Sequence, residues 1–201
     1  DVLDLSKIEA GKITLESVDF RLRSTIDGVV NSLKSLAKSK GLPIEVHIPT
    51  GVPDCIKGDQ TRFKQVLLNL LGNAVKFTDQ GGVVLRLKHL RDMATIEIED
   101  SGPGIAAEDI ERIFEPFSRG THVAQSSVGT GMGLTIARML TTLMGGELTV
   151  KSRLGQGTCF TVRLFLPQVQ EDQAFRARPA RHYTGYAGQR RRILIVDHEH
   201  A

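Results

Sequence analysis

The sequence contains no tryptophan, and its few phenylalanines and tyrosines make up only 5% of 201 residues. Aliphatic side chains must therefore build the core. No apolar run approaches the roughly 20 residues that a membrane-spanning helix needs, and no basic stretch followed by apolar residues opens the chain as in a secretory signal. We therefore expect a soluble chain, and the balance of 40% hydrophobic and 24% charged residues is globular.

Cysteine and net charge are also scarce. Cys55 and Cys159 are isolated and lack CxxC spacing, which favours inert thiols in a reducing compartment. The net charge of +3 is too small to indicate nucleic-acid binding by itself. Between Gln173 and Arg192, however, there are six arginines and no acidic residue. We interpret this segment as a linker, with binding to nucleic acid or an anionic membrane as the weaker alternative.

Changes in composition, together with glycine and proline residues that end helices and strands, divide the chain into four segments. Residues 1–11 have helical apolar spacing and end at Gly11, a typical C-terminal cap. Residues 12–167 form the folded domain, and residues 168–192 form the Arg-rich linker. Residues 193–201 begin with an all-apolar run, as expected of a buried parallel strand.

Periodicity within residues 12–167 predicts both helices and strands. The predicted helices cover residues 20–40, a long segment capped by Asp59, and residues 107–114 and 130–144. The predicted strands, the first of them weak, cover residues 12–20, 44–48, 83–90, 94–99, 147–153 and 158–166. Residues 118–128 have no periodicity and predict a loop.

The long helix carries the first group of residues that could support chemistry. Asn69, Asn73 and Lys76 are spaced i, i+4 and i+7, so they share an edge distinct from the apolar face. Two carboxamide oxygens one turn apart suit a hard cation such as Mg²⁺ bound to phosphates. The alternative for this segment alone is a solvated polar helix face.

The second group follows a predicted strand, where Asp100 precedes Gly102 and Gly104. Glycines let the backbone approach a flat ligand or adopt positive φ, and an aspartate there can accept a hydrogen bond from an exocyclic amine such as that of adenine. Seen alone, this motif could equally be a tight turn.

The third group is a glycine-rich segment, Gly129 to Leu134, that opens the last predicted helix. Backbone N–H groups at a helix N-terminus bind anions. The spacing is neither that of a Walker loop nor that of a dinucleotide-binding turn.

In this order, and with Phe114-Glu115-Pro116-Phe117 between the last two, these groups closely resemble the ATP-binding catalytic domain of sensor histidine kinases. That domain belongs to the gyrase B, Hsp90, histidine kinase and MutL (GHKL) superfamily. The resemblance covers roughly residues 12–167. We expect an α+β sandwich: one mixed, mostly antiparallel sheet of about five strands with about three helices on one face.

The resemblance assigns four sequence boxes. Residues 69–78 resemble the N box, residues 100–104 the G1 box, residues 114–117 the F box and residues 129–134 the G2 box. Residues 118–128 would form the lid over ATP.

Residue roles follow from the same resemblance. Asn73 would hold Mg²⁺, with Asn69 beside it as a second candidate ligand. Lys76 would contact phosphate. The resemblance thus implies that Asn69 and Lys76 are the catalytic residues. Phe77 would lie against adenine, and Asp100 would bind its amino group.

The other residues implied at the ATP site are Gly102, Gly104, Ile105, Phe117, Arg119, Gly129, Thr130, Gly131, Met132, Gly133 and Leu134. Two of these assignments have alternatives. Phe117, like Phe114, could instead pack in the core beneath the lid, and Arg119 could be a solvated surface residue.

Asn69 also bears on the reaction. In the ATP-hydrolysing relatives, a glutamate four residues before the metal-binding asparagine activates water, and an asparagine cannot act as that base. The resemblance therefore implies slow hydrolysis and transfer of the γ-phosphate to a histidine nucleophile.

The two ends resemble neighbouring parts of a hybrid kinase. Residues 1–11 resemble the end of a dimerisation helix, without the helix that bears the phospho-accepting histidine, so we expect this chain alone to be a monomer that does not autophosphorylate. Residues 193–201 resemble the first strand of a receiver, although His198 interrupts the acidic pair expected at Asp197.

The family expectation for the parent is a bacterial homodimer at the inner membrane with this domain in the cytoplasm. Its partners would be the dimerisation domain and a receiver or response regulator. The alternative function is a nucleotide- or receiver-binding regulatory module without phosphotransfer.

Overall fold

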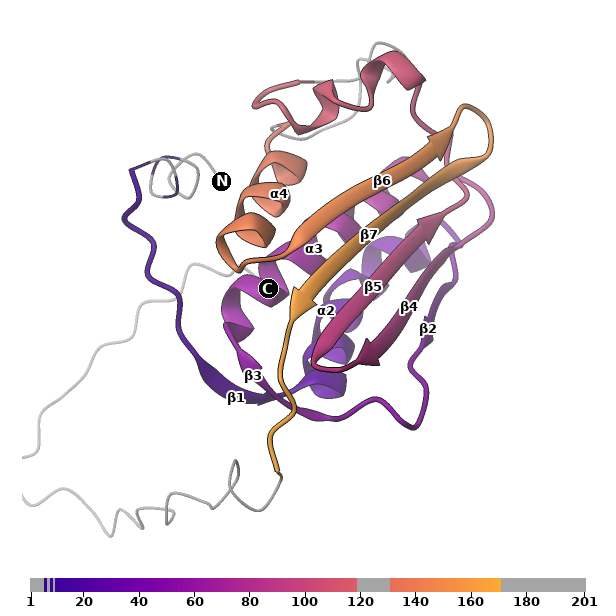
Figure 1. Ribbon diagram of the computed structural model, residues 1–201. Helices are drawn as coiled ribbons and strands as arrows, with labels where there is room; N and C mark the ends of the chain where they lie inside the picture. Colours follow the sequence, from indigo (N-terminus) through magenta and orange to yellow (C-terminus); the bar gives the residue numbers. More distant parts are fainter. Residues whose placement is uncertain (1–5, 7, 9, 119–130, 171–201) are drawn as a thin grey trace, which may run out of the picture.

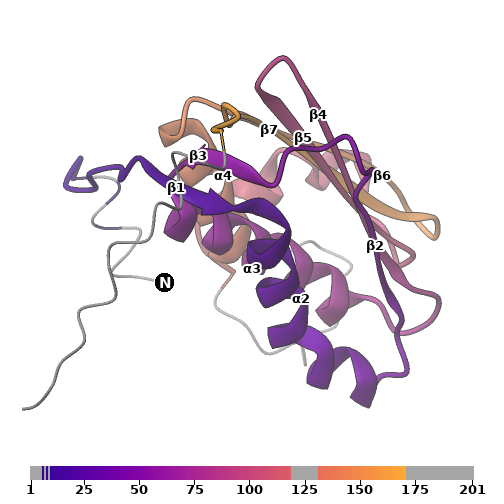
Figure 2. The same cartoon turned by 90° about the horizontal axis from the view of Figure 1, so that it is seen from below.

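A five-stranded sheet covered on one face by three helices forms the body of the molecule (Figures 1 and 2). The computed structural model describes residues 6, 8, 10–118 and 131–170. The helices and strands in chain order are β1 (Val18–Arg21), α2 (Leu22–Ser39), β2 (Ile44–His47), β3 (Cys55–Gly58), α3 (Gln60–Phe77), β4 (Val83–Leu90), β5 (Met93–Asp100), α4 (Gly133–Leu143), β6 (Glu147–Arg153) and β7 (Gly157–Phe165). The predicted α+β sandwich is confirmed.

The main sheet has the strand order β2-β4-β5-β7-β6. Only β2 and β4 run parallel, and the other neighbours are antiparallel. The sheet is therefore mixed and mostly antiparallel, as predicted. The parallel pair is possible because α3 lies in the connection between β2 and β4, as a parallel crossover requires.

A second, two-stranded sheet pairs β1 with β3. The sequence did not predict β3, and the strand predicted over residues 12–20 is confined to Val18–Arg21. Neither strand alternates regularly between buried and exposed residues, and β3 begins with two buried residues in succession.

The core lies between α3 and the inner face of the sheet. On α3 the buried positions repeat at helical spacing: Phe63, Val66, Leu67, Leu70, Leu71, Ala74 and Val75. Opposite them, alternate sheet residues are at most 1% exposed: Leu85, Leu87, Ile96, Ile98, Val162 and Leu164. Aliphatic packing thus replaces the missing tryptophan, and the edge of α3 that remains outside the core can carry polar side chains.

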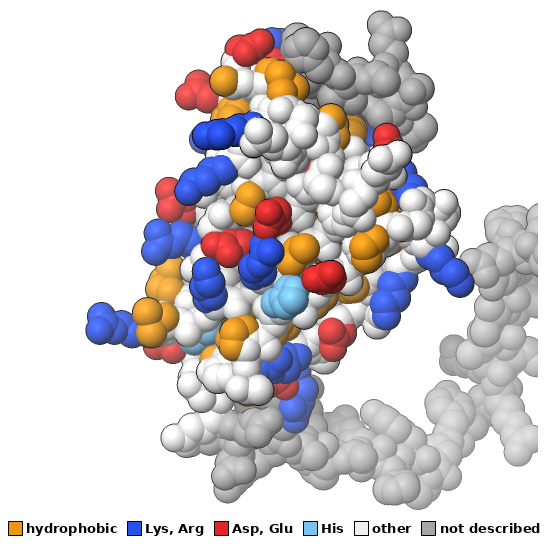
Figure 3. Space-filling model, turned by 90° about the vertical axis from the view of Figure 1, so that its right-hand side faces the viewer, with side chains coloured by type: hydrophobic (Ala, Val, Ile, Leu, Met, Phe, Trp, Pro, Cys, Tyr) orange, Lys and Arg blue, Asp and Glu red, His pale blue; other side chains and the backbone are white. Residues whose placement is uncertain are grey.

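The outer face of the sheet explains why its strands alternate in polarity. Acidic and basic side chains are interspersed on the side shown in Figure 3. Arg86 pairs with Glu99 across β4 and β5, and Lys88 lies 3.6 Å from Glu97. Such exposed pairs contribute little to stability, so burial of the inner face holds the sheet.

Asp59 fixes the start of α3, as the sequence predicted. One carboxylate oxygen accepts the Arg62 backbone N–H at 2.9 Å, and the other accepts the Glu16 N–H at 3.0 Å. Asp59 is only 6% exposed. Its side chain therefore caps the helix and also ties the segment before β1 to it.

Two helical predictions were wrong in detail. Residues 107–114 form two short 3-10 helices, Ala107–Asp109 and Arg112–Phe114, rather than one α-helix. The last helix begins at Gly133 rather than at Thr130, which lies outside the described residues. Glycines at 129, 131 and 133 favour an irregular approach to α4 over an extra turn.

The predictions for the chain ends are only partly covered by the described residues. The Gly11 N–H bonds to the Ile8 carbonyl and Gly11 has a φ of 62°, as a C-terminal glycine cap requires. The linker predicted over residues 168–192 starts too early, because Gln168 and Val169 pair with β3. The rest of it beyond residue 170 and the strand predicted from residue 193 lie outside the described residues. Among the described residues, no helix combines the length and apolarity needed to cross a membrane.

We predict that Asp59→Ala lowers the free energy of unfolding by about 2 kcal/mol, because it removes the helix cap and the bond to Glu16. Urea unfolding measures this change. Asp59→Asn keeps an acceptor for the cap and should cost less than about 1 kcal/mol. Equal stability of Asp59→Ala and the unchanged chain would show that the cap contributes nothing.

Candidate functional site

The N-box residues meet the start of α4 across the interface between α3 and α4. A methyl group placed on Gly133, the first residue of α4, would lie 3.5 Å from Asn69 Oδ1 and 3.8 Å from Asn73 Nδ2. Two motifs that are distant in sequence therefore share one site. Because Gly133 has no side chain, its backbone lies close to both carboxamides.

Asn69 has unused bonding capacity. Its Nδ2 is buried and has no hydrogen-bond partner among the described residues. A buried amide without a partner is costly, and native structures rarely keep one without a function or a missing ligand. Nδ2 is a donor, so it suits a phosphate oxygen rather than a metal ion. The side-chain oxygens of Asn69 and Asn73, one turn apart, are neutral ligands of the kind that Mg²⁺ accepts alongside phosphates, so the residues fit the implied metal.

Lys76 and Phe77 end α3 beside these asparagines. The Lys76 ammonium lies 4.6 Å from the centroid of the Phe77 ring, a cation–π distance. Both side chains are half-buried. A positive charge and an aromatic face thus adjoin the carboxamide pair.

The G1 box meets the end of the N box. A methyl group on Gly102 would lie 2.9 Å from Asp100 Oδ1 and 3.2 Å from both the Phe77 carbonyl and Thr78 Oγ1. Gly102 is buried, and its N–H donates to Asp100 Oδ1 at 2.9 Å. Asp100 at the end of β5 and the last residues of α3 therefore form a second region of the same site.

Burial raises the pKa of the Asp100 carboxyl, while bonds from the Gly102 and Thr158 backbone N–H groups partly offset that rise. The carboxylate is an acceptor in a partly dehydrated environment, where a matching donor is bound more strongly than in water.

Thr78 is a functional candidate that the sequence analysis did not single out. Its side chain is 0% exposed, and Oγ1 has no partner among the described residues. The signal available was a hydroxyl residue directly after the last turn of a motif-bearing helix.

Gly104 permits a close backbone contact. Its φ is +71°, and a methyl group there would overlap the Arg153 carbonyl oxygen at the end of β6. The next residue, Ile105, donates its N–H to Ser152 Oγ at 2.8 Å and packs against the core. Gly104 therefore brings the segment after Asp100 against the end of β6.

The two F-box phenylalanines differ. Phe114 packs edge-on against Phe160 at 6.5 Å, with the Arg138 guanidinium 4.9 Å from its ring, so the core interpretation fits it. Phe117 is 64% exposed, so the core alternative is wrong for this residue. A methyl group on Gly131 would come within 3.2 Å of the Phe117 backbone, which places the F box next to the G2 box.

The remaining predicted residues fall into two groups. Met132 is buried in the core and Leu134 packs against it, so the backbone is what the G2 box offers to a ligand there. Arg119, Gly129 and Thr130 lie outside the described residues, and their assignment stays a prediction.

Comparison with known proteins finds histidine kinases and related ATPases. Residues 58–168 match the family described as histidine kinase-, DNA gyrase B- and HSP90-like ATPases. The signal transduction histidine-protein kinase BarA of Escherichia coli (strain K12) is 39% identical over 166 residues, covering 80% of this chain and 18% of BarA. Hybrid signal transduction histidine kinase B of Dictyostelium discoideum is 38% identical over 167 residues, covering 80% of this chain and 8% of that protein. The chain thus spans less than a fifth of either relative.

Among solved structures, full-length ShkA in complex with AMPPNP has a TM-score of 0.75 and 32% identity. The match covers 84% of this chain and 35% of ShkA.

We predict that Gly104→Ala destabilises the domain more than Gly155→Ala. Both glycines have positive φ, so both changes carry the cost of about 1–2 kcal/mol for a left-handed residue. Only Gly104 also faces a carbonyl oxygen, because nothing lies within 4 Å of a methyl group on Gly155. Urea unfolding should show at least about 2 kcal/mol more loss for Gly104→Ala, and equal losses would contradict the close contact.

We also predict that Asp100→Asn removes a pH-dependent loss of stability. Because the folded-state pKa of Asp100 is raised above its ordinary 3.8, the folded chain holds this proton more tightly than the unfolded chain does. Its contribution to stability is therefore lost as pH rises through the folded pKa. In ligand-free urea unfolding between about pH 4 and about pH 8, the variant should gain stability relative to the unchanged chain as pH rises.

The control for this series is Glu108→Gln, which changes an exposed carboxyl. Its stability should follow that of the unchanged chain at every pH. A parallel curve for Asp100→Asn would mean that burial of Asp100 has no energetic consequence.

Proposed function

The chain belongs to the histidine kinase-, DNA gyrase B- and HSP90-like ATPase family, and we propose that it binds Mg-ATP and donates the γ-phosphate to a histidine of a two-component sensor kinase. It is an ATP-binding domain of the histidine kinase type, as BarA and ShkA indicate. The proposal of Mg-ATP binding and phosphate transfer rests mainly on one observation: Asn69 and Asn73 lie beside Gly133 at the N-terminus of α4.

Asp100 would recognise the base. Its carboxylate accepts a hydrogen bond from the exocyclic amine of adenine, whereas guanine presents a carbonyl oxygen at the same position. The unpartnered hydroxyl of Thr78 lies at the same end of the site. A partly buried acceptor would thereby favour adenine over guanine.

The phosphates would lie between α3 and α4. Backbone N–H groups and the positive end of the α4 dipole, near Gly131 and Gly133, suit an anion. Lys76 would add a positive charge from α3. Asn73, with Asn69, would hold Mg²⁺, which neutralises phosphate charge when bound.

Asn69 would then favour phosphate transfer over ATP hydrolysis. A carboxamide cannot accept the proton of an attacking water as a carboxylate can, so bound ATP should be hydrolysed slowly. Phosphoryl transfer depends mainly on positioning and charge neutralisation. The site would thus keep ATP intact until a histidine nucleophile is presented.

The relatives of this chain support the proposal that it is one domain of a larger kinase. The name of the Dictyostelium relative describes a hybrid kinase, in agreement with the receiver-like sequence at residues 193–201. The partners would be a dimerisation domain and a receiver or response regulator. We expect the parent to be a homodimeric membrane sensor with this domain in the cytoplasm, and this chain alone to be a monomer inactive in autophosphorylation.

Calorimetric titration with ADP, with and without Mg²⁺, tests the proposal. Asn73→Ala should raise the Kd for Mg-ADP by about 10- to 100-fold and change Mg-free binding by less than about threefold, because it removes a metal ligand. Asn31→Ala, an exposed asparagine on α2, is the matched control and should leave both affinities unchanged.

A folded chain that binds no nucleotide would refute the proposal and favour the partner-binding alternative. If nucleotide binds, adding a dimerisation domain with its histidine should yield phosphohistidine under Mg-ATP. Nucleotide binding without any transfer would favour the regulatory module.

A further inference from the structure

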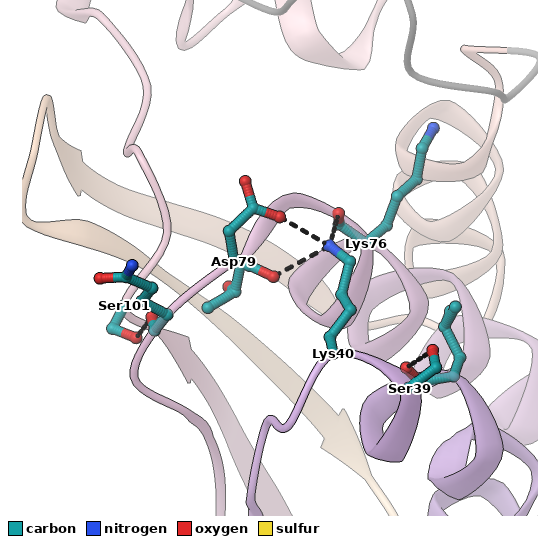
Figure 4. Close-up of polar contacts among 8 residues, drawn as sticks. Ser39, Lys40, Lys76, Asp79 and Ser101 are labelled. Carbon is teal, nitrogen blue, oxygen red and sulfur yellow. Dashed lines mark hydrogen bonds and ion pairs between the residues drawn. The ribbon is translucent and has the colours of Figure 1, made fainter.

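Lys40 lies outside all four sequence boxes, yet it contacts the end of α3. The ammonium of Lys40 donates to the Lys76 carbonyl at 2.6 Å and to the Thr78 carbonyl at 3.0 Å, and it lies 3.0 Å from Asp79 Oδ1 (Figure 4). The side chain of Lys76 points away from Lys40 in the same view. The two lysines therefore act on different sides of this helix end.

The end of α2 aims Lys40 at this position. Gly41 has a φ of +67°, and the Leu42 N–H bonds back to the Ala37 carbonyl at 2.9 Å, which together terminate the helix in a Schellman-type turn. Because this turn fixes the Lys40 backbone, its side chain crosses from α2 to α3 in a defined direction.

The carbonyls that Lys40 contacts need a donor. The last carbonyls of an α-helix have no partner within the helix, and they form the negative end of its dipole. The Lys40 side chain is 27% exposed, so its hydrogen bonds are partly shielded from water and charge-assisted. Lys40 thus supplies both the missing donors and the complementary charge.

Residues 76–78, which Lys40 holds in this way, form the part of the proposed site that would bind the adenine base. The Phe77 carbonyl and Thr78 Oγ1 lie around Gly102, next to Asp100. Just after that segment, Ser101 Oγ donates to the Gln80 carbonyl and accepts the Gly82 N–H, both at 2.9 Å. The turn after α3 is therefore held by Lys40, the residue directly after α2, and by Ser101, the residue directly after β5.

We infer that Lys40 is a positioning residue for nucleotide binding: its ammonium fixes residues 76–78 so that Phe77 and Thr78 stay in place beside Asp100. This inference rests on the proposed function. The carbonyl contacts carry the effect, and the ion pair does not, because the Asp79 side chain is 89% exposed and such pairs contribute little.

Titration of the full chain with ADP tests the inference. Lys40→Met keeps the apolar stem and removes the donors, and should raise the Kd about five- to tenfold by the same factor with and without Mg²⁺. Asp79→Asn should bind within about twofold of the unchanged chain. Lys40→Arg, which keeps charge and donors, should restore most of the affinity.

A stability control separates positioning from general destabilisation. Val29→Ala removes buried volume on α2, away from the carbonyls that Lys40 contacts, and should lower the free energy of unfolding without changing the Kd. If Lys40→Met does not fold, Lys40→Gln takes its place with an expected loss of about threefold.

Wild-type affinity in the Lys40 variant, an equal loss in Asp79→Asn, or an equal loss in Val29→Ala would each overturn the inference alone. So would a loss seen only with Mg²⁺, which would locate the effect at the metal rather than at the base. If the unchanged chain itself binds no ADP, the proposed function fails first and the inference fails with it.

Discussion

Burial of one face of α3 is the constraint on which the rest of the structure depends. That face packs into the inner side of the sheet, and seven of its residues are buried. Because a helix has a fixed period, this burial also fixes the direction of the opposite edge, where Asn69, Asn73 and Lys76 follow one another. Core packing and site geometry are thus set by the same helix.

The site is assembled by glycines as much as by functional side chains. A side chain at Gly102 would crowd Asp100, and one at Gly133 would contact Asn69 and Asn73. At Gly104, a close approach to β6 is possible only without a Cβ. These glycines lie where β5 meets the end of α3, where the segment after β5 meets β6, and where α3 meets α4.

Periodicity was sufficient to predict α2, α3, the four long antiparallel strands and β2, because each buries a regularly repeating apolar face. It failed for β3, whose four residues carry no distinguishable pattern, and for residues 107–114, where successive short 3-10 turns mimic helical spacing. The Asn69, Asn73 and Asp100 assignments came from motif resemblance. The structure places both asparagines beside Gly133, and it places Asp100 beside Gly102 and the end of α3. Their ligand roles are still predictions.

Contacts between distant segments were not predictable from sequence. Lys40 reaches residues 76 and 78 only because α2 and α3 end side by side. No local sequence pattern indicates this arrangement. The second bond of Asp59, to Glu16, likewise joins segments that are distant in sequence. The sequence indicated a cap there, but not the segment that it also holds.

The unused polar groups of the site have an evolutionary consequence. Asn69 and Thr78 each keep a buried polar atom without a partner among the described residues, and Asp100 is partly dehydrated. Apolar substitutions at Asn69 and Thr78 would remove these unpartnered groups, and replacement of Asp100 by asparagine would remove the partly buried charge. Selection for thermal stability alone would therefore erode this region first, and its persistence in a lineage would record selection for a bound ligand.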